Sequence, residues 1–279
     1  PELPEVETIR SDLQSLIVGR EIISVHVLLP KLLRGPSKQE FESRLKGCRF
    51  TGVGRRAKII ILTLSSGDCL LVHLKMSGRL VYLPVEVERE KHTHVIFALD
   101  NDYELRFVDM RQFGYIKLVD GCLLDQVSEI AGLGPEPLDQ SFSEAVFARM
   151  IEERKKSRRV IKALLIDQKF IAGIGNIYAD EILHTSGIHP ERQLASLSKR
   201  EIESLYLAII STLKVAIEFR GTTFDRYVDA RGRTGNYLEE LRVYGRGGER
   251  CRECGSTIEK KKIAGRGTNF CPRCQKLAR

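Results

Sequence analysis

The sequence predicts an α+β protein in which one helix precedes a β-sandwich, a helical domain follows, and a four-cysteine module ends the chain. Short apolar segments separated by turn residues run from residue 21 to about 119, which is typical of a sandwich. Apolar residues at helical spacing then dominate residues 143–219, and two Cys-x-x-Cys pairs lie beyond residue 250. A chain of 279 residues with 42% hydrophobic content is long enough to divide these elements among more than one domain.

The first helix is expected almost at the start of the chain. Apolar side chains recur there at helical spacing, with acidic residues ahead of them and Gly19 as a stop signal. The apolar positions are Val6, Ile9, Leu13, Leu16 and Ile17. Such a pattern predicts a helix that buries one face against its domain.

Strands are expected between this helix and the next change of texture. Several of them are continuous apolar runs, as in the core of a sandwich. They include residues 22–29, 59–64, 70–74, 94–99, 104–108 and 115–119. Residues 132–137, Gly-Leu-Gly-Pro-Glu-Pro, cannot continue a helix or a central strand, so we expect a linker there.

Helices are expected after the linker, and Ser198 with Glu201 has the sequence of a capping box at the start of the last one. The expected helices cover residues 143–153, 159–167, 176–185 and 198–219. The expected domains are an amino-terminal sandwich at 1–131, a linker at 132–140, a helical domain at 141–240 and the four-cysteine module at 241–279.

The positive charge is concentrated at the end of the chain. Residues 241–279 carry 11 Lys and Arg against 3 Asp and Glu, so the net charge of +8 lies there and residues 1–240 are neutral. This asymmetry is typical of contact with a nucleic acid or another anionic surface. No apolar run approaches the roughly 18–20 residues of a membrane-spanning helix. The opening residues, 1–5, lack the features of a signal peptide, and the hydrophobic content argues against disorder.

Three of the seven cysteines, Cys48, Cys69 and Cys122, stand singly in apolar or strand-like surroundings. Buried small hydrophobic residues are the ordinary interpretation of such cysteines. The odd number of cysteines and the absence of a leader favour a reducing compartment over a disulfide framework.

The other four cysteines form two Cys-x-x-Cys pairs separated by sixteen residues. They are Cys251, Cys254, Cys271 and Cys274. Four thiolates at this spacing predict a tetrahedral, structural zinc site, since four protein ligands leave no open position for a substrate. Iron or a redox-active pair is the alternative.

Short motifs along the whole chain resemble the bacterial formamidopyrimidine-DNA glycosylases. The chain opens with Pro-Glu-Leu-Pro-Glu-Val-Glu-Thr and ends with the four-cysteine module. The motifs between them lie at 55–58, 73–79, 91–94, 109–114, 132–137, 173–178 and 264–268. The resemblance implies a β-sandwich, a helix–two-turns–helix domain and a zinc finger. It also implies a base-excision repair enzyme that removes formamidopyrimidine and 8-oxoguanine and nicks the strand by β,δ-elimination.

Four residues match the catalytic positions of the family: Pro1, Glu2, Lys58 and Arg266. A terminal proline amine has a pKa near 7.7–8.0, so it is nucleophilic at neutral pH, and the resemblance assigns it a Schiff base with the sugar. A chain starting at Pro1 also results from ordinary removal of methionine. Glu2 would move protons on the opened sugar, although a carboxylate is also favoured at a helix start.

The resemblance assigns Lys58 and Arg266 phosphate contacts and help with the first and second elimination. By its own position, Lys58 also fits the solvated start of a strand. Arg266 lies between two glycines at the expected tip of a hairpin. Glu5 stays open, as a structural or solvated residue.

Further residues match DNA contacts of the family. His73 and Asn176 would hold phosphates, and the helix beginning at Asn176 is expected to offer its amides to a phosphate. His92 would also contact DNA. Arg158 is the candidate from the basic run 155–159, whose register is ambiguous. The remaining histidines, His184 and His189, are expected at the surface or as caps.

Met76, Arg111 and Phe113 match the residues that fill the void left by a flipped-out base. Met and Phe side chains wedge between bases, and Arg reaches the orphaned partner. Taken alone, Met76 and Phe113 fit an ordinary core better.

Two other functions remain open from the sequence. A sister endonuclease of the same superfamily prefers oxidised pyrimidines and typically starts Pro-Glu-Gly-Pro-Glu. This chain instead has Leu3 and a long loop, 221–237, suited to covering a purine. A non-catalytic zinc-ribbon DNA-binding protein would need neither a free Pro1 amine nor a pocket carboxylate. The resemblance implies a cytoplasmic monomer that acts on damaged double-stranded DNA across the cleft between its domains. It also implies zinc as the cofactor, no redox cofactor and no membrane partner.

Overall fold

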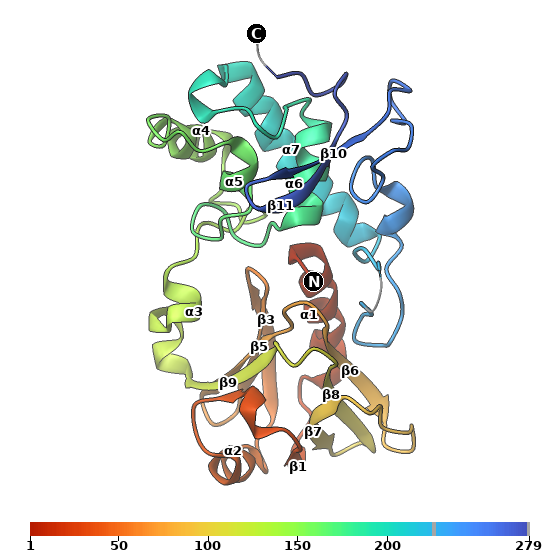
Figure 1. Ribbon diagram of the computed structural model, residues 1–279. Helices are drawn as coiled ribbons and strands as arrows, with labels where there is room; N and C mark the ends of the chain where they lie inside the picture. Colours follow the sequence, from red (N-terminus) through yellow and green to blue (C-terminus); the bar gives the residue numbers. More distant parts are fainter. Residues whose placement is uncertain (225–226, 278–279) are drawn as a thin grey trace. The chain divides into compact units, whose positions relative to one another are not determined.

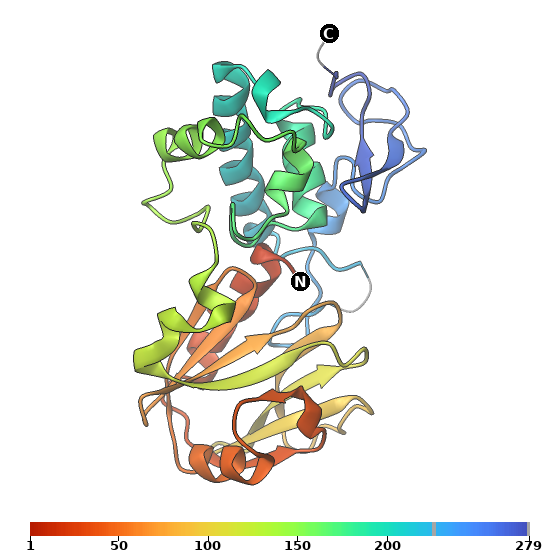
Figure 2. The ribbon, with the colours of Figure 1, turned by 60° about the vertical axis from the view of Figure 1, so that its left-hand side comes forward.

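The computed structural model describes residues 1–224 and 227–277 and divides into two compact units, shown in two views in Figures 1 and 2. Unit 1 contains Pro1, Leu3–Ala131 and Phe219–Leu238. Unit 2 contains Glu2, Gly132–Glu218 and the residues from Glu239 onward. Residues 219–238, which the sequence analysis assigns to the helical domain, thus pack in unit 1.

Unit 1 is built on two sheets. The antiparallel four-stranded sheet has the order β1-β7-β8-β6, with β1 (Ile22–Val27), β6 (Gly78–Pro84), β7 (Thr93–Leu99) and β8 (Tyr103–Asp109). The five-stranded sheet has the order β2-β9-β5-β4-β3, with β2 (Leu33–Arg34), β3 (Phe50–Arg56), β4 (Ile59–Leu64), β5 (Asp68–His73) and β9 (Tyr115–Asp120). Its β2–β9 pair is parallel, and its other pairs are antiparallel.

All six expected strands are present, but β2, β3, β6 and one α-helix longer than four residues were not expected. The residues of β3 include Gly52 and Gly54 and end in two arginines, so they lack an apolar run. The helix is α2 (Lys38–Leu45), whose buried residues are Phe41 and Leu45, too few to show a helical period.

The core of unit 1 lies between the two sheets and α1 (Leu3–Ile17). Val6, Ile9, Leu13 and Ile17 of α1 are fully buried, as the spacing predicts. Buried side chains of both sheets join the same cluster, and so do Tyr227 and Ala230 of the segment 219–238. These two residues explain why that segment belongs to unit 1.

Unit 2 contains the expected helices, with α4 (Glu144–Glu152) and α6 (Asn176–Thr185) packed on α7 (Lys199–Glu218). The short α5 (Ile161–Leu165) precedes α6. The capping box of α7 is confirmed, because Glu201 accepts the Ser198 N–H at 2.8 Å and the Ser198 hydroxyl accepts the Glu201 N–H at 3.2 Å. The short η3 (Leu194–Ser196) also lies in unit 2, and η4 (Tyr237–Glu240) spans the boundary between the units in the chain. The short helices η1 (Pro30–Leu32), η2 (Gly121–Gln126) and α3 (Ser128–Ala131) lie in unit 1.

The four-cysteine module of unit 2 contains the hairpin of β10 (Glu259–Ile263) and β11 (Arg266–Phe270), which lies beside α6 (Figure 1). Ala264 and Gly265 join the strands with φ of 51° and 75°, as a two-residue hairpin turn requires. Within residues 1–224 and 227–277, no helix is long and apolar enough to cross a membrane.

Candidate active site and metal centre

The carboxylate of Glu2 caps the start of α6. Its two oxygens accept the N–H groups of Gly175 at 2.6 Å, Ile177 at 2.9 Å and Tyr178 at 3.4 Å. Glu2 is 8% exposed. These amides were expected to meet a phosphate, and that expectation is wrong for this structure, because the carboxylate occupies them. A helix N-terminus favours a negative charge of either kind.

Asn176 and Arg266 lie on neighbouring parts of unit 2. The Asn176 side-chain N–H donates to the Gly267 carbonyl at 2.9 Å, which ties the start of α6 to β11. Arg266 is exposed beside the turn of the hairpin, at the tip where the sequence predicts it. The structure therefore brings Asn176 together with the strand that carries Arg266.

A buried ion pair fastens the same strand to the helices. Lys162 of α5 pairs with Asp180 of α6, and both side chains are fully buried. Asp180 also accepts the Asn269 N–H of β11 at 2.8 Å. Burial raises the pKa of Asp180 to about 6, against the opposing effects of the Lys162 ammonium and the Asn269 N–H.

Glu181 plays a similar part at the other end of the module. Its carboxylate accepts the N–H groups of Arg242 at 2.8 Å, Val243 at 2.9 Å and Tyr244 at 2.8 Å. Burial raises the pKa of Glu181, although these three amides favour the charged form. Asp180 and Glu181 are not predictable from the sequence, since nothing in their local pattern indicates partners some 60 to 90 residues away.

The four predicted ligands form one cluster. The Sγ atoms of Cys251, Cys254, Cys271 and Cys274 all lie within 4.8 Å of one another. Two of the separations are 3.9 Å, between Cys251 and Cys274, and 3.4 Å, between Cys254 and Cys271. A ZnS₄ tetrahedron with Zn–S bonds of about 2.3 Å has edges of roughly 3.8 Å, so the donor set and the spacing fit zinc.

The expectations for His184 and Cys122 are wrong, whereas His189 acts as a cap, one of the two roles expected of it. His184 is 5% exposed rather than at the surface, and its Nε2 lies 3.5 Å from Cys251 Sγ. His189 is also buried, and its Nδ1 accepts the Glu191 N–H at 3.1 Å. Cys122 is exposed, because the chain leaves β9 for η2 just before it. Cys48 and Cys69 are buried as expected.

In unit 1, Lys58 lies in the two-residue turn between β3 and β4, where Arg56 pairs with Ile59. Ala57, the other turn residue, has φ of 52°. Lys58 is half-buried rather than fully solvated. The next strand places His73 opposite Ile59, so Lys58 and His73 lie at the same end of the sheet.

His73 is held as a neutral imidazole. Its Nδ1 accepts the Lys75 N–H at 3.0 Å, which leaves the proton on Nε2. Burial lowers the pKa of His73 to about 3, and the positive charges of Lys75, Lys58 and the Pro1 amine add to this effect. His73, Lys58 and Pro1 thus belong to one electrostatic neighbourhood, with an N–H available for an anion.

The residues predicted to fill the place of a flipped-out base come from two adjacent turns. Gly78 of β6 pairs with Asp109 of β8, so the turns that carry Met76 and Arg111 lie at one end of this sheet. The buried Asp109 accepts the Ser77 hydroxyl and the N–H groups of Arg111 at 3.2 Å and Gly114 at 2.8 Å. This role of Asp109 was not predicted from the sequence.

Met76 and Phe113 are 70% and 57% exposed, so the interpretation as ordinary core is wrong. The Arg111 guanidinium lies 5.1 Å from the centre of the Phe113 ring, a cation–π distance. Large exposed apolar side chains beside an arginine suit insertion into a base stack.

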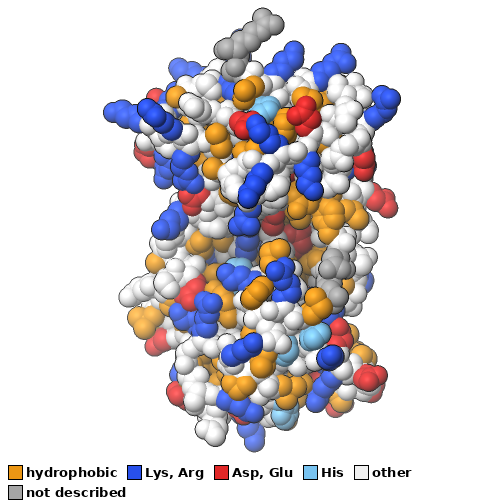
Figure 3. Space-filling model, viewed as in Figure 1, with side chains coloured by type: hydrophobic (Ala, Val, Ile, Leu, Met, Phe, Trp, Pro, Cys, Tyr) orange, Lys and Arg blue, Asp and Glu red, His pale blue; other side chains and the backbone are white. Residues whose placement is uncertain are grey.

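The remaining predicted DNA contacts are less tightly embedded. His92 lies just before β7, partly exposed, with its ring 6.3 Å from that of His94. Arg158 is exposed in the segment between α4 and α5. In the view of Figure 3, blue Lys and Arg side chains are scattered over the visible surface of both units, with hydrophobic side chains among them.

Comparison with known proteins decides the family. The models of the formamidopyrimidine-DNA glycosylase N-terminal domain, of its H2TH domain, and of a zinc finger found in FPG and IleRS match residues 1–116, 133–227 and 248–277. The chain belongs to the formamidopyrimidine-DNA glycosylase family. It is therefore a DNA glycosylase of base-excision repair, and its four cysteines bind a structural zinc.

Relatives match along the whole chain. The formamidopyrimidine-DNA glycosylases of Pelotomaculum thermopropionicum and Desulforamulus reducens are 49% and 46% identical over 277 residues, 99% of each chain. A Lactococcus lactis Fpg in complex with abasic-site DNA is 37% identical, with a TM-score of 0.92 over 99% of this chain and 100% of that one. The same Lactococcus lactis protein has been crystallised with DNA that contains an oxidised pyrimidine.

Proposed function

We propose that this protein removes oxidised purines, chiefly formamidopyrimidines and 8-oxoguanine, from double-stranded DNA and then cuts the strand by β- and δ-elimination. Membership of the formamidopyrimidine-DNA glycosylase family supports damaged DNA as the substrate. The observation that carries the mechanism is the Glu2 carboxylate, which three amides of unit 2 fix in place directly after Pro1 in the chain. The protein acts as a monomer in the bacterial cytoplasm, and the reaction needs no redox cofactor.

Pro1 is the proposed nucleophile. Its amine is substantially neutral near pH 7.7–8.0, so its lone pair attacks C1′ of the damaged nucleotide. The bond from C1′ to the base breaks, the base leaves with a proton, and an iminium joins Pro1 to the opened sugar. Glu2 exchanges protons with the sugar as the ring opens. Its three amide donors fix the carboxylate for this task.

The iminium then draws electrons from the sugar, so that loss of the C2′ proton expels one phosphate and a second elimination expels the other. Lys58 contacts phosphate and assists proton transfer in the first elimination. Arg266 contacts phosphate at the hairpin tip and assists the second. His73 and Asn176 hold neighbouring phosphates, as do His92 and Arg158 further along the DNA.

Met76, Arg111 and Phe113 support this reaction by replacing the base that must leave the stack. Unstacking costs a few kcal/mol per step, and the inserted apolar side chains offset part of that cost. The exposure of Met76 and Phe113 favours this role over packing in the core.

Borohydride trapping tests the nucleophile. Mass spectrometry first establishes that the protein begins at Pro1. Incubation with an 8-oxoguanine duplex and borohydride should then reduce the iminium to a stable amine and give one protein–DNA adduct per active molecule. An extra residue ahead of Pro1 turns its nitrogen into an amide, which should abolish trapping and strand cleavage while zinc content and binding to undamaged DNA persist.

Lys58 is the competing nucleophile in this experiment. An ordinary lysine with a pKa near 10.4 is almost wholly protonated at pH 7, so it competes poorly. Peptide mapping of the adduct decides between the two amines. DNA attached to the peptide that begins at Pro1 supports the mechanism, and DNA attached to the Lys58 peptide contradicts it.

A panel of lesion duplexes tests the substrate class. We expect faster excision of 8-oxoguanine and formamidopyrimidine opposite cytosine than of thymine glycol opposite adenine. If thymine glycol were the better substrate, the enzyme would instead be one for oxidised pyrimidines.

A further inference from the structure

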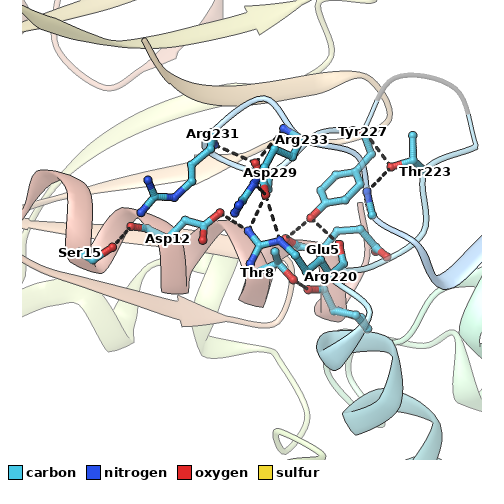
Figure 4. A network of polar contacts seen from close by, with 12 residues as sticks. Glu5, Thr8, Asp12, Ser15, Arg220, Thr223, Tyr227, Asp229, Arg231 and Arg233 are labelled. Carbon is cyan, nitrogen blue, oxygen red and sulfur yellow. Dashed lines mark hydrogen bonds and ion pairs between the residues drawn. The ribbon is translucent and has the colours of Figure 1, made fainter. Parts of the chain in front are cut away.

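The segment 219–238 is fastened to α1 by a dense polar network, drawn in Figure 4. Residues from the first three turns of α1 face one side of it, and the segment supplies the other side. Buried Tyr227 lies within it, and its hydroxyl donates to the Arg220 carbonyl at 3.1 Å and to the Glu5 carbonyl at 3.4 Å. The described residues of the segment therefore pack into the sandwich domain and do not merely cross its surface as a linker.

Arg220 occupies the start of the segment in an unusual conformation. Its φ is 61°, in the left-handed region that favours glycine. Its guanidinium donates to Asp12 of α1 and also to Asp229, whose Oδ2 accepts Nε at 3.0 Å. One side chain thus joins α1 to two positions of the segment, which compensates for the unfavourable backbone.

Asp229 organises the far end of the same segment. It is 1% exposed and accepts the N–H groups of Arg231 and Arg233, both at 2.9 Å. Burial opposes its ionisation, but the Arg233 N–H and the Arg220 guanidinium outweigh burial and hold the pKa of Asp229 below its usual value. The bridge Asp12–Arg220–Asp229 therefore ties two described ends of the loop, Arg220 and Asp229, to α1.

The near end of the loop is held at the first turn of α1. The carboxylate of Glu5 is 1% exposed and accepts the Thr222 N–H at 2.8 Å. Gly221 has φ of 80°, and a Cβ there would lie 2.7 Å from Glu5 Oε1, so the backbone approaches as closely as glycine allows. The Thr223 hydroxyl accepts the Gly235 N–H at 2.9 Å. This first turn of α1 begins at Leu3, two residues after Pro1.

We propose that Arg220 is a positioning residue for base removal, because its bridge to Asp12 and Asp229 holds residues 221–224 at the end of α1 that carries Pro1. The inference rests on the proposed function, since it takes Pro1 as the nucleophile. A damaged base attached to the C1′ that Pro1 attacks must lie near this end of the helix. The loop can therefore orient a base that is present, and it has nothing to orient at an abasic site.

Two reactions of the full-length, zinc-loaded protein test this. Arg220→Ala should slow single-turnover excision of 8-oxoguanine and formamidopyrimidine at least tenfold and leave cleavage of a preformed abasic site within twofold of the wild type. Arg220→Lys should recover part of the excision rate, because an ammonium can keep one arm of the bridge. Asp12→Asn removes the charge of the α1 arm alone and should slow excision less than Arg220→Ala.

Arg233→Ala is the matched control. It removes another guanidinium from Asp229, with Nε at 3.0 Å, but leaves the bridge to α1 intact. We expect less than a twofold change in either reaction.

Equal losses of excision and abasic-site cleavage in Arg220→Ala would overturn the inference, because they would reveal a general defect. Unchanged excision would overturn it as well. If Arg220→Ala does not fold, Asp12→Asn and Arg220→Lys decide in the same way. A wild-type protein that cleaves neither substrate would contradict the proposed function itself, and the inference with it.

Discussion

The sandwich of unit 1 and the four-cysteine finger of unit 2 are stabilised by different means. The sandwich has a large apolar core to which α1, both sheets and the segment 219–238 contribute. The buried cluster of the finger consists of four residues, Val243, Cys251, Ile258 and Cys271, two of which are metal ligands. A segment this short cannot bury enough apolar surface, so a metal supplies what the core lacks.

The two parts therefore differ in how much stability they lose when one side chain is removed. Loss of one side chain from the sandwich removes a fraction of many apolar contacts. Loss of one thiolate from the finger removes a quarter of the ligands that define its fold. The carboxylates of Asp180 and Glu181 then have no ordered partner in the finger, although they remain on a helix that packs elsewhere.

The largest effect is expected from Cys251→Ser. Zinc binding supplies about 10–16 kcal/mol in zinc-finger peptides, so its loss should unfold the β10–β11 hairpin. Zinc per protein, measured by atomic absorption, should fall to near zero, and affinity for lesion DNA should fall with the displacement of Arg266. Hydrogen exchange of the unit 1 strands should be unchanged. Full DNA affinity in the metal-free variant would show that the finger is not a phosphate clamp.

A core substitution in the sandwich should have a smaller effect than Cys251→Ser. It should lower the stability of the sandwich and leave zinc binding unchanged. Phe97 is fully buried, with the rings of Phe41 and Phe50 both 6.4 Å away. Phe97→Ala should lower the free energy of unfolding by about 3–5 kcal/mol while zinc content stays the same. Calorimetry measures the first and atomic absorption the second. Leu28→Ala, at a side chain 58% exposed, is the control and should cost under about 0.5 kcal/mol.

His73 should make the stability of the sandwich depend on pH. Its folded pKa is about 3, below the unfolded value of 6.5, so the unfolded chain takes up a proton first as the pH falls. The contribution of His73 is complete above pH 6.5 and is lost as the pH drops toward 3. His73→Asn keeps an acceptor for the Lys75 N–H but does not titrate. Relative to this variant, the wild type should lose about 1.4 kcal/mol on going from pH 7.5 to pH 5.5.

One outcome would contradict the pH dependence predicted for His73. Parallel stability curves for the wild type and His73→Asn between pH 5.5 and 7.5 would mean that the imidazole gains its proton in the folded protein as readily as in the unfolded one.

The smallest effect is expected inside the ligand shell of the finger. A hydrogen bond from the buried His184 to Cys251 Sγ would lower the reactivity of that thiolate. His184→Phe should therefore speed alkylation of Cys251 by iodoacetamide about fivefold, the equivalent of roughly 1 kcal/mol. Mass spectrometry of the zinc-loaded protein identifies which of the four zinc ligands reacts first, separately from the exposed Cys122. His189→Asn, at a buried histidine that caps Glu191, should leave the order of reaction unchanged.

The sequence predicts the parts of the fold whose signal is local. Apolar spacing places α1 and the six strands, the capping box places α7, and the cysteine pairs place the metal ligands. It misses α2, because a helix of eight residues with two buried positions shows no period. It also misses β3, because glycines and arginines interrupt its apolar pattern.

The candidate site is predictable only as a set of residues. Motifs name Glu2 and Asn176, but no local pattern shows that the Glu2 carboxylate occupies the amides at the start of α6. The partners lie more than 170 residues apart, and tertiary packing alone decides such a pairing. The same reason hides the bridge of Arg220, since a lone arginine ordinarily indicates only a solvated charge.

The exposure of Cys122 has a practical consequence. Cys48 and Cys69 are buried, the other four cysteines belong to the zinc cluster, and all seven lie among the residues that the structure describes. A maleimide dye added to the zinc-loaded protein therefore meets one accessible thiol. The natural chain thus carries its own fluorophore attachment point on the sandwich, and single molecules can be followed on DNA without an engineered cysteine.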